Sequence, residues 1–207
     1  MDKEVVILTM SSKNKKYCVA GIDISSGKWV RLISNDASSH GALSRNEVRY
    51  NNGMQCKPLD IAKISFIEER PLDYQPENTL IDTQKRWRKI DEITVDDLLK
   101  IHPPERHSYL LGNQYAYITE ARIGFVGHSL IMVKVYNLAI YRAYGFKIKA
   151  MFTYNGCEYK DISVTDPDYF EIDKLEYKTA LLVMSLPESP FPENRYYKFV
   201  AKVFPLC

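Results

Sequence analysis

The sequence predicts a mostly β protein built of two small β-barrels with few short helices. Short runs of β-branched and aromatic residues alternate with turn residues along the whole chain. The second half repeats the strand pattern of the first half, and convincing helix signals are confined to residues 94–101. These observations favour paired barrels and argue against a doubly wound α/β fold.

The first predicted element is a meander of three strands, at residues 4–9, 17–24 and 29–34. The sequence Ser-Ser-Gly-Lys at residues 25–28 predicts the hairpin turn between the last two strands. Alternation in the third strand puts Trp29 and Arg31 on one face.

A polar loop follows at residues 35–53, with one helical turn expected near 43–48, and then a fourth strand at 60–68. Residues 70–82 carry two prolines and are expected to be loop with short extended pieces. The helix at 94–101 has Thr94 as its N-cap and is stopped by Pro103-Pro104. This proline pair predicts the boundary between a domain of residues 1–104 and one of 105–207.

The second half contains six runs that are predicted to be strands, at residues 115–123, 129–136, 146–154, 158–165, 180–186 and 196–204. Asn155-Gly156 joins two of them and is typical of a two-residue type I′ hairpin.

Composition excludes several classes of protein. Lys and Arg number 28 against 26 Asp and Glu, so the net charge is +2, without a basic tail or an acidic disordered segment. No apolar run approaches the length of a membrane helix or fits a signal peptide, and the four Cys show no paired spacing. We therefore expect a cytoplasmic protein with reduced thiols and no membrane partner.

Several segments, spread in order over the chain, are similar to a known family. In the first half they are 11–23, Gly27-Lys-Trp-Val-Arg-Leu-Ile-Ser34, 59–61, 75–78, 80–82 and Trp87. In the second half they are Phe152-Thr-Tyr-Asn-Gly156, Tyr159, 163–167, 183–186 and 197–201. Together they resemble the dual OB-domain family of prokaryotic proteins. The resemblance implies two OB-like barrels, recognition of nucleic acid or a nucleotide, and a role in prokaryotic conflict or defence systems.

Basic residues surround Tyr17 in the first predicted hairpin, at Lys13, Lys15 and Lys16. In an OB barrel this loop flanks the ligand face, where cations beside an aromatic ring suit a phosphate backbone with stacked bases. The alternative is a solvated turn that carries charge.

Two further clusters combine cations with indole rings. Trp29 and Arg31 share a strand face and can bind a base with its phosphate, unless Trp29 belongs to the barrel core. Arg86, Trp87 and Arg88 can line a groove for single-stranded nucleic acid, or form an edge strand whose charge blocks unwanted pairing.

Enzyme signatures are sparse. The sequence has no P-loop, no GxGxxG and no HExxH, and its His and Cys lack zinc spacing, so we expect no metal and no cofactor. Glu158-Tyr-Lys160 has the Glu-x-Lys pattern of a metal-dependent nuclease, but no acidic residue lies between Glu120 and Glu158 to supply its companion ligand.

The sequence therefore predicts a non-catalytic module that binds single-stranded nucleic acid or a nucleotide through OB-barrel faces. The alternative is a protein-interaction scaffold or an accessory subunit of a multi-gene system. Whether the aromatic clusters lie in a concave positive groove or on a flat apolar patch discriminates the two. The 15 tyrosines fall mostly on predicted strands, where barrel packing is their first explanation.

Overall fold

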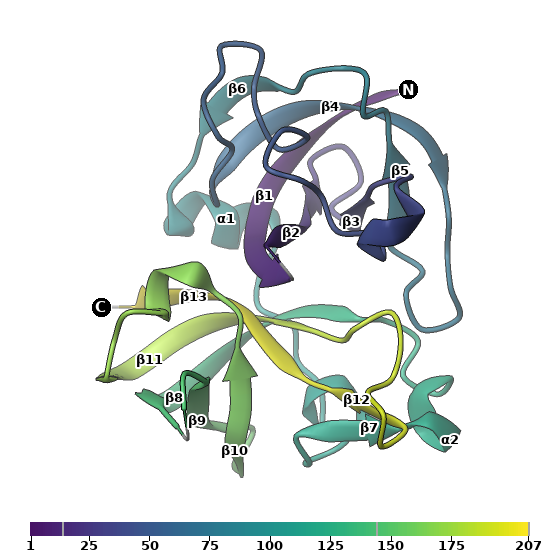
Figure 1. Ribbon diagram of the computed structural model, residues 1–207. Helices are drawn as coiled ribbons and strands as arrows, with labels where there is room; N and C mark the ends of the chain where they lie inside the picture. Colours follow the sequence, from purple (N-terminus) through teal and green to yellow (C-terminus); the bar gives the residue numbers. More distant parts are fainter. Residues whose placement is uncertain (14, 144, 207) are drawn as a thin grey trace. The chain divides into compact units, whose positions relative to one another are not determined.

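The computed structural model describes residues 1–13, 15–143 and 145–206, with the backbone alone at Lys13 and Ala37. The chain divides into two compact units. The first consists of Met1–Leu72 and Pro76–Pro103, and the second of Asp73–Gln75 and Pro104–Cys207. Each unit has its own hydrophobic core, enclosed by a β-barrel (Figure 1).

The first barrel closes through five strands. In order around the barrel they are β1 (Asp2–Lys13), β2 (Lys16–Asp23), β3 (Trp29–Ile33), β5 (Asn78–Ile81) and β4 (Asp60–Glu69), which pairs back with β1. The β3–β5 pair is parallel and the other pairs are antiparallel. A sixth strand, β6 (Arg88–Glu92), pairs antiparallel with β4 at residues 60–63.

The second barrel repeats this connectivity. Its order is β8 (Leu130–Arg142), β9 (Ile148–Tyr154), β10 (Cys157–Val164), β13 (Phe199–Leu206) and β11 (Lys174–Ser185), and the ring closes between β11 and β8. The parallel β10–β13 pair corresponds to β3–β5. Five strands closed in this way form an OB-type barrel, so the predicted fold class of two small OB-like β-barrels is confirmed.

Alternation of side chains explains how the strands fill the barrels. In β9 every second residue is buried, from Ile148 to Tyr154, and the residues between them face outward. The Asn155-Gly156 hairpin follows as predicted, because both residues have positive φ angles of 47° and 77° and Tyr154 pairs with Cys157.

Short elements connect the strands. β7 (Tyr117–Thr119) and β12 (Arg195–Tyr197) form a two-stranded sheet, and α2 (Glu120–Ile123) follows β7 directly. Helix α1 (Val95–Ile101) begins at Thr94, which forms a capping box with Asp97 as its N-cap position predicts. Three 3₁₀ turns complete the chain, at η1 (Ala37–Ser39), η2 (Leu110–Gly112) and η3 (Pro167–Tyr169). In the described residues no helix has the length and apolar character needed to cross a bilayer.

Several local predictions differ from the structure. The predicted strand 115–123 is β7 followed by α2, and the predicted strand 196–204 is divided at Lys198 between β12 and β13. Residues 70–82, predicted to be loop with short extended pieces, contain β5, which closes the first barrel, and neither β5 nor β6 was predicted as a regular strand. Both missed strands are short and rich in polar residues, and partner strands distant in sequence hold them in place.

Candidate functional site

The basic hairpin between β1 and β2 lies at the surface of the first barrel. Lys15 is exposed at the turn with a φ angle of 63°, while the side chain of Lys13 lies outside the described residues. Lys16 pairs with Asp36 at 2.7 Å, and this contact helps to lower the pKa of the Asp36 carboxyl to about 2. The Tyr17 ring packs partly buried against the core. Of this cluster, Lys15 remains the cation most open to a ligand.

Trp29 and Arg31 share one face of β3, as the alternation predicts, and the structure shows that this face points away from the core. Val30 and Leu32 are buried in the core, whereas Trp29 and Arg31 lie on the outer face of the barrel. The Trp29 ring meets the His102 ring edge-on at 5.4 Å. The Arg31 side chain is only 12% exposed and forms an ion pair with Glu77 at 3.8 Å. The guanidinium therefore already has a counter-charge.

The cluster at residues 86–88 divides between surface and core. Trp87 is 1% exposed and is the largest buried side chain of the described chain, so its ring offers no surface for a base to stack on. Arg86 is exposed and donates to the Asn46 carbonyl, and Arg88 is exposed on β6. Because β5 and β4 separate β3 from β6, the sheet does not bring this cluster to the β2–β3 face.

A cleft of about 1010 Å³ opens on the second barrel, and its described lining includes none of the predicted site residues. Its floor is the outer face of β9 and β10, the second and third strands of the barrel. Residues 145–147, between the first and second strands, line one side, and Phe191, Glu193 and Tyr197, between the fourth and fifth strands, line another. This is the face through which OB folds bind oligonucleotides and oligosaccharides.

A half-buried lysine lies on the floor of this cleft. The Lys149 Nζ donates to the Ser163 hydroxyl at 2.9 Å and to the Asp161 carbonyl at 3.1 Å. Burial lowers the pKa of Lys149, and the negative charge of Asp161 opposes this shift, although within the described residues no carboxylate lies within 4.0 Å of its ammonium group. A partly desolvated cation with neutral partners is a suitable contact for a ligand anion.

Further charges surround Lys149. Lys147 is exposed on the loop 143–147, which the bond from the Ala143 N–H to the Lys147 carbonyl closes at 2.8 Å. Arg142 donates to the carbonyls of Phe170 and Ile172, so it holds the wall of the cleft in place. Glu171 and Glu193 add negative charge at the rim, which limits the total attraction for a polyanion.

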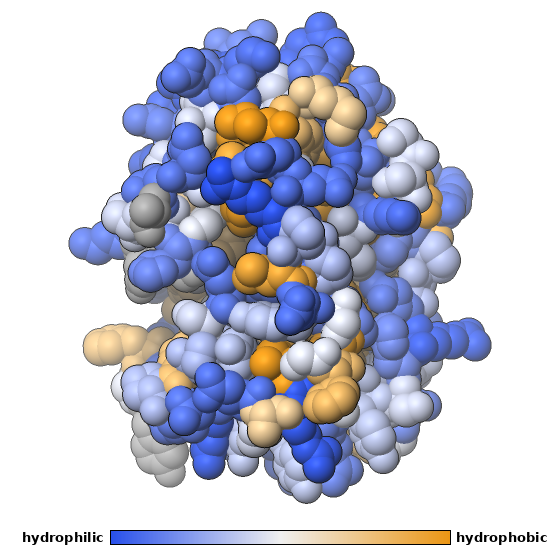
Figure 2. Space-filling view, turned by 90° about the vertical axis from the view of Figure 1, so that its right-hand side faces the viewer, coloured by the Kyte–Doolittle hydropathy of each residue, from blue (hydrophilic) through white to orange (hydrophobic). Residues whose placement is uncertain are grey.

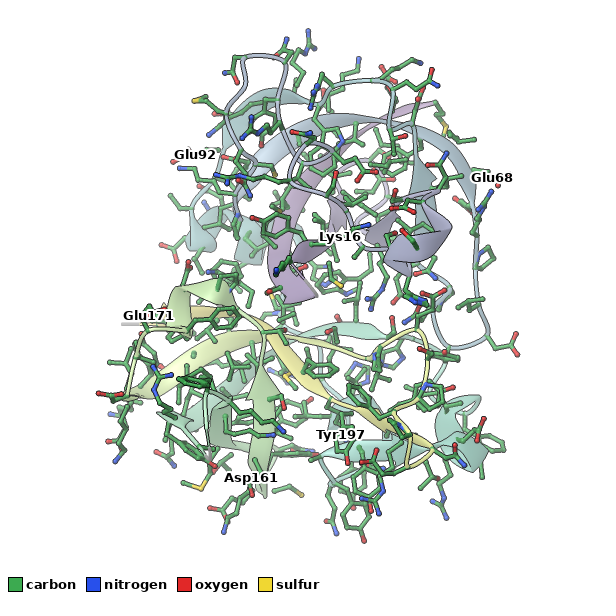
Figure 3. All side chains as sticks on the ribbon, in the orientation of Figure 1. Lys16, Glu68, Glu92, Asp161, Glu171 and Tyr197 are labelled. Atoms are coloured by element: carbon green, nitrogen blue, oxygen red, sulfur yellow. The ribbon has the colours of Figure 1, made fainter. Side chains whose placement is uncertain are left out.

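Aromatic rings form much of the remaining wall. Phe146 is 93% exposed on the loop 143–147, and Phe191, Tyr197 and Phe199 lie on the side of β12 and β13. Figure 3 labels Tyr197 on β12 and Glu171 in the loop after η3, with β10 between them in this view. Exposed rings beside cations suit the stacking of bases and the binding of phosphates.

Sequence reasoning missed this cleft because it weighed the first hairpin and not its counterpart in the second barrel. Gly145-Phe-Lys-Ile-Lys149 has the same mixture of cations and an aromatic residue as Lys15-Lys-Tyr17. The signal was present, but Lys149 was counted within a predicted strand. Only the barrel connectivity shows that both segments join a first strand to a second strand.

Glu158 and Lys160, the residues of the Glu-x-Lys pattern, pair with each other in the structure. The two side chains bond each other at 2.7 Å on the exposed face of β10. Across the described residues, no group of three or more His, Cys, Asp and Glu is placed to hold a metal ion.

Two barrels of this connectivity, with a cleft on one of them, define a protein of the OB-fold class. The family model of the dual OB-containing domain matches residues 3–203, and the chain belongs to this family. Among solved structures, the crystal structure of the tetrameric p202 HIN2 matches 100% of this chain and 94% of its own, with a TM-score of 0.35 and 9% identity. We infer no shared function from that likeness. A comparison with curated proteins gave no match.

Proposed function

We propose that this protein binds single-stranded nucleic acid, or a nucleotide, in the cleft of the second barrel, without catalysing a reaction. The observation that carries the proposal is Lys149, a half-buried cation among neutral partners on the floor of an OB ligand face. Phosphate supplies the missing negative charge, and the rings of Phe146 and Tyr197 can stack on bases. A neutral oligosaccharide would use the rings but leave Lys149 without an anion.

The protein-interaction scaffold has less support. The cleft is concave and combines cations with aromatic rings, which is the arrangement expected of a nucleic-acid site. On the face that Figure 2 shows, hydrophobic residues lie in small patches separated by hydrophilic ones. Stable protein interfaces usually have a larger apolar centre.

The first test is binding of a fluorescently labelled oligothymidylate and of a labelled nucleotide, measured by anisotropy at low salt. Lys149→Met is expected to weaken binding about tenfold, because it removes one charge-assisted contact. Lys147→Met is expected to have a smaller effect, since Lys147 is fully solvated. Lys160→Met is the matched control, because Lys160 lies on the same barrel but pairs with Glu158 outside the cleft.

The same binding assay also tests which of the two barrels binds the ligand. Lys15→Met and Arg88→Gln remove exposed cations of the first barrel, where the sequence predicted the site. If these variants weaken binding while Lys149→Met and Lys147→Met bind like the wild type, the cleft is the wrong site. If the wild type binds neither probe at low salt, the proposed function itself is wrong. Circular dichroism of Lys149→Met checks that a loss of binding is not a loss of folding.

A further inference from the structure

We propose that the ligand is a strand of several nucleotides, which leaves the cleft and continues over a ladder of aromatic rings on β7 and β12. The inference rests on the proposed function and adds the length of the ligand and a second binding surface. The name aromatic ladder is used below for Phe199, Phe191, Tyr197, Tyr117 and Tyr115.

The ladder is continuous from the cleft outward. The ring centroids of Phe199 and Phe191 lie 6.2 Å apart, and those of Phe191 and Tyr197 lie 5.2 Å apart. Tyr197 is 5.9 Å from Tyr117, and Tyr117 is 6.4 Å from Tyr115. The first three rings line the cleft and the last two lie beyond it. A ligand that fills the cleft therefore meets an adjoining aromatic surface.

Strand register explains why these rings share a face. Tyr197 of β12 lies opposite Tyr117 of β7, and Tyr196 lies opposite Ile118. Tyr196 and Ile118 are buried in the core of the second unit, so the alternate residues Tyr197 and Tyr117 face away from that core. The small sheet is thus apolar inside and aromatic outside.

One cation, Arg195, lies next to the aromatic ladder. The Arg195 guanidinium lies over the Tyr117 ring at 4.3 Å from its centroid. The Tyr197 hydroxyl and the negative charge of Glu193 raise the pKa of Arg195, but in the described part of the chain no carboxylate comes within 4.0 Å of this guanidinium. A guanidinium stacked on a ring keeps donors in its own plane, where they can bind a phosphate oxygen. Arg195 thus supplies outside the cleft the charge that Lys149 supplies inside it.

Packing alone does not explain the end of the ladder. Rings between two strands can serve merely to hold β7 on β12. Tyr115, however, precedes β7 and is 60% exposed, although its backbone is fixed by the bond from its N–H to the Asn113 Oδ1 at 2.9 Å. A large exposed ring on an anchored segment is preorganised for a partner.

The test is a length series of oligothymidylates, from a dinucleotide to about 10 nucleotides, a range typical of one OB fold. The wild type is expected to bind the longest strand at least tenfold more tightly than the dinucleotide. Tyr115→Ala and Arg195→Gln are expected to lose most of this gain but to bind the dinucleotide like the wild type. Tyr136→Ala is the matched control, since Tyr136 is also exposed and has Lys134 over its ring, on β8 outside the cleft.

Two outcomes overturn the inference and leave the proposed function intact. One is a wild type that binds the dinucleotide as tightly as the longest strand. The other is that Tyr115→Ala and Arg195→Gln keep the full increase in affinity with oligonucleotide length, or lose no more of this increase than Tyr136→Ala does. Loss of all binding in the wild type is a different result, because it contradicts the proposed function at every length.

Discussion

At the scale of residues, the surroundings of each cation decide what it can do. Arg31 and Lys16 both satisfied a plausible pattern for nucleic-acid binding, yet the fold gives them Glu77 and Asp36 as counter-charges. Lys149 belongs to a similar pattern, but it donates its hydrogen bonds to a hydroxyl and a carbonyl, and the Asp161 carboxylate acts on it only from beyond ion-pair distance. The same residue type is therefore internally neutralised in one barrel and left open to an anion in the other.

A buried lysine makes the stability of the second unit depend on pH. Lys198 is 1% exposed, donates to the backbone and side-chain oxygens of Asn113, and burial lowers its pKa to about 7. Between that pKa and about 10.4 the unfolded chain holds the proton that the folded chain has lost, so stability rises with pH. The expected gain is up to about 1.4 kcal/mol per pH unit above pH 7.

Lys198→Met separates this effect from other titrations. Denaturant unfolding of both proteins, followed by circular dichroism between about pH 7 and pH 9, should give a steeper rise for the wild type than for the variant. Equal slopes would mean that Lys198 keeps its proton throughout this window, through its bonds to Asn113.

At the scale of elements, the close pairing of β1 with β2 depends on one glycine, Gly21. A Cβ on Gly21 would lie 2.1 Å from the Val6 carbonyl oxygen and 2.8 Å from a Val5 methyl group. The register of the two strands shifts beside this point, between Ile7 and Thr9. A bulge of this kind bends a strand enough to close a small barrel.

Gly21→Ala is therefore expected to destabilise the first unit by about 3 kcal/mol or more, since a backbone oxygen has to move. Both tryptophans, Trp29 and Trp87, belong to that unit, so tryptophan fluorescence during denaturation reports on it directly. Gly53→Ala is the control: its Cβ meets nothing within 4 Å, and its φ of 84° costs about 1 kcal/mol. Equal losses in the two variants would show that the close approach at Gly21 relaxes freely.

Elements with strong local signals could be predicted from the sequence. Thr94 with Asp97 marks the start of α1, and Asn155-Gly156 marks the hairpin of β9 and β10. β5 could not be predicted, because Asn78 and Thr79 look like loop residues until their burial between β3 and β4 is known. Local chemistry dictates turns and caps, whereas a short strand depends on its distant partners.

At the scale of the whole molecule, a net charge of +2 predicts modest binding to a polyanion. Lys147, Lys149 and Arg195 are the cations proposed to meet phosphates. Because each phosphate contact with a single strand contributes about −0.7, the logarithm of the affinity should fall with the logarithm of the salt concentration with a slope of about −2.

Anisotropy titrations of the longest oligothymidylate over a series of salt concentrations measure this slope. Arg195→Gln should make it less steep by about 0.7, and Lys160→Met should leave it unchanged. A slope near zero would contradict a phosphate contact, and a slope several times steeper would require cations outside the cleft and the ladder.

The sequence by itself determined the class of this protein: mostly β, with two OB-like barrels and neither a strongly basic nor an acidic surface. The mostly β class, the two small barrels and the balanced charge follow from composition, strand periodicity and turn residues, all of which act locally. The OB type of the barrels was implied by the family resemblance. Only the tertiary structure decided which side chains lie together in a cleft. Barrel closure brings Phe146, Lys149 and Tyr197 to one cleft, although almost fifty residues separate the last two. The tertiary structure also pairs Arg31 with Glu77 and buries Trp87 in the core of the first unit. Burial and ion pairing depend on residues that are distant in sequence, so the sequence pattern alone could not predict them.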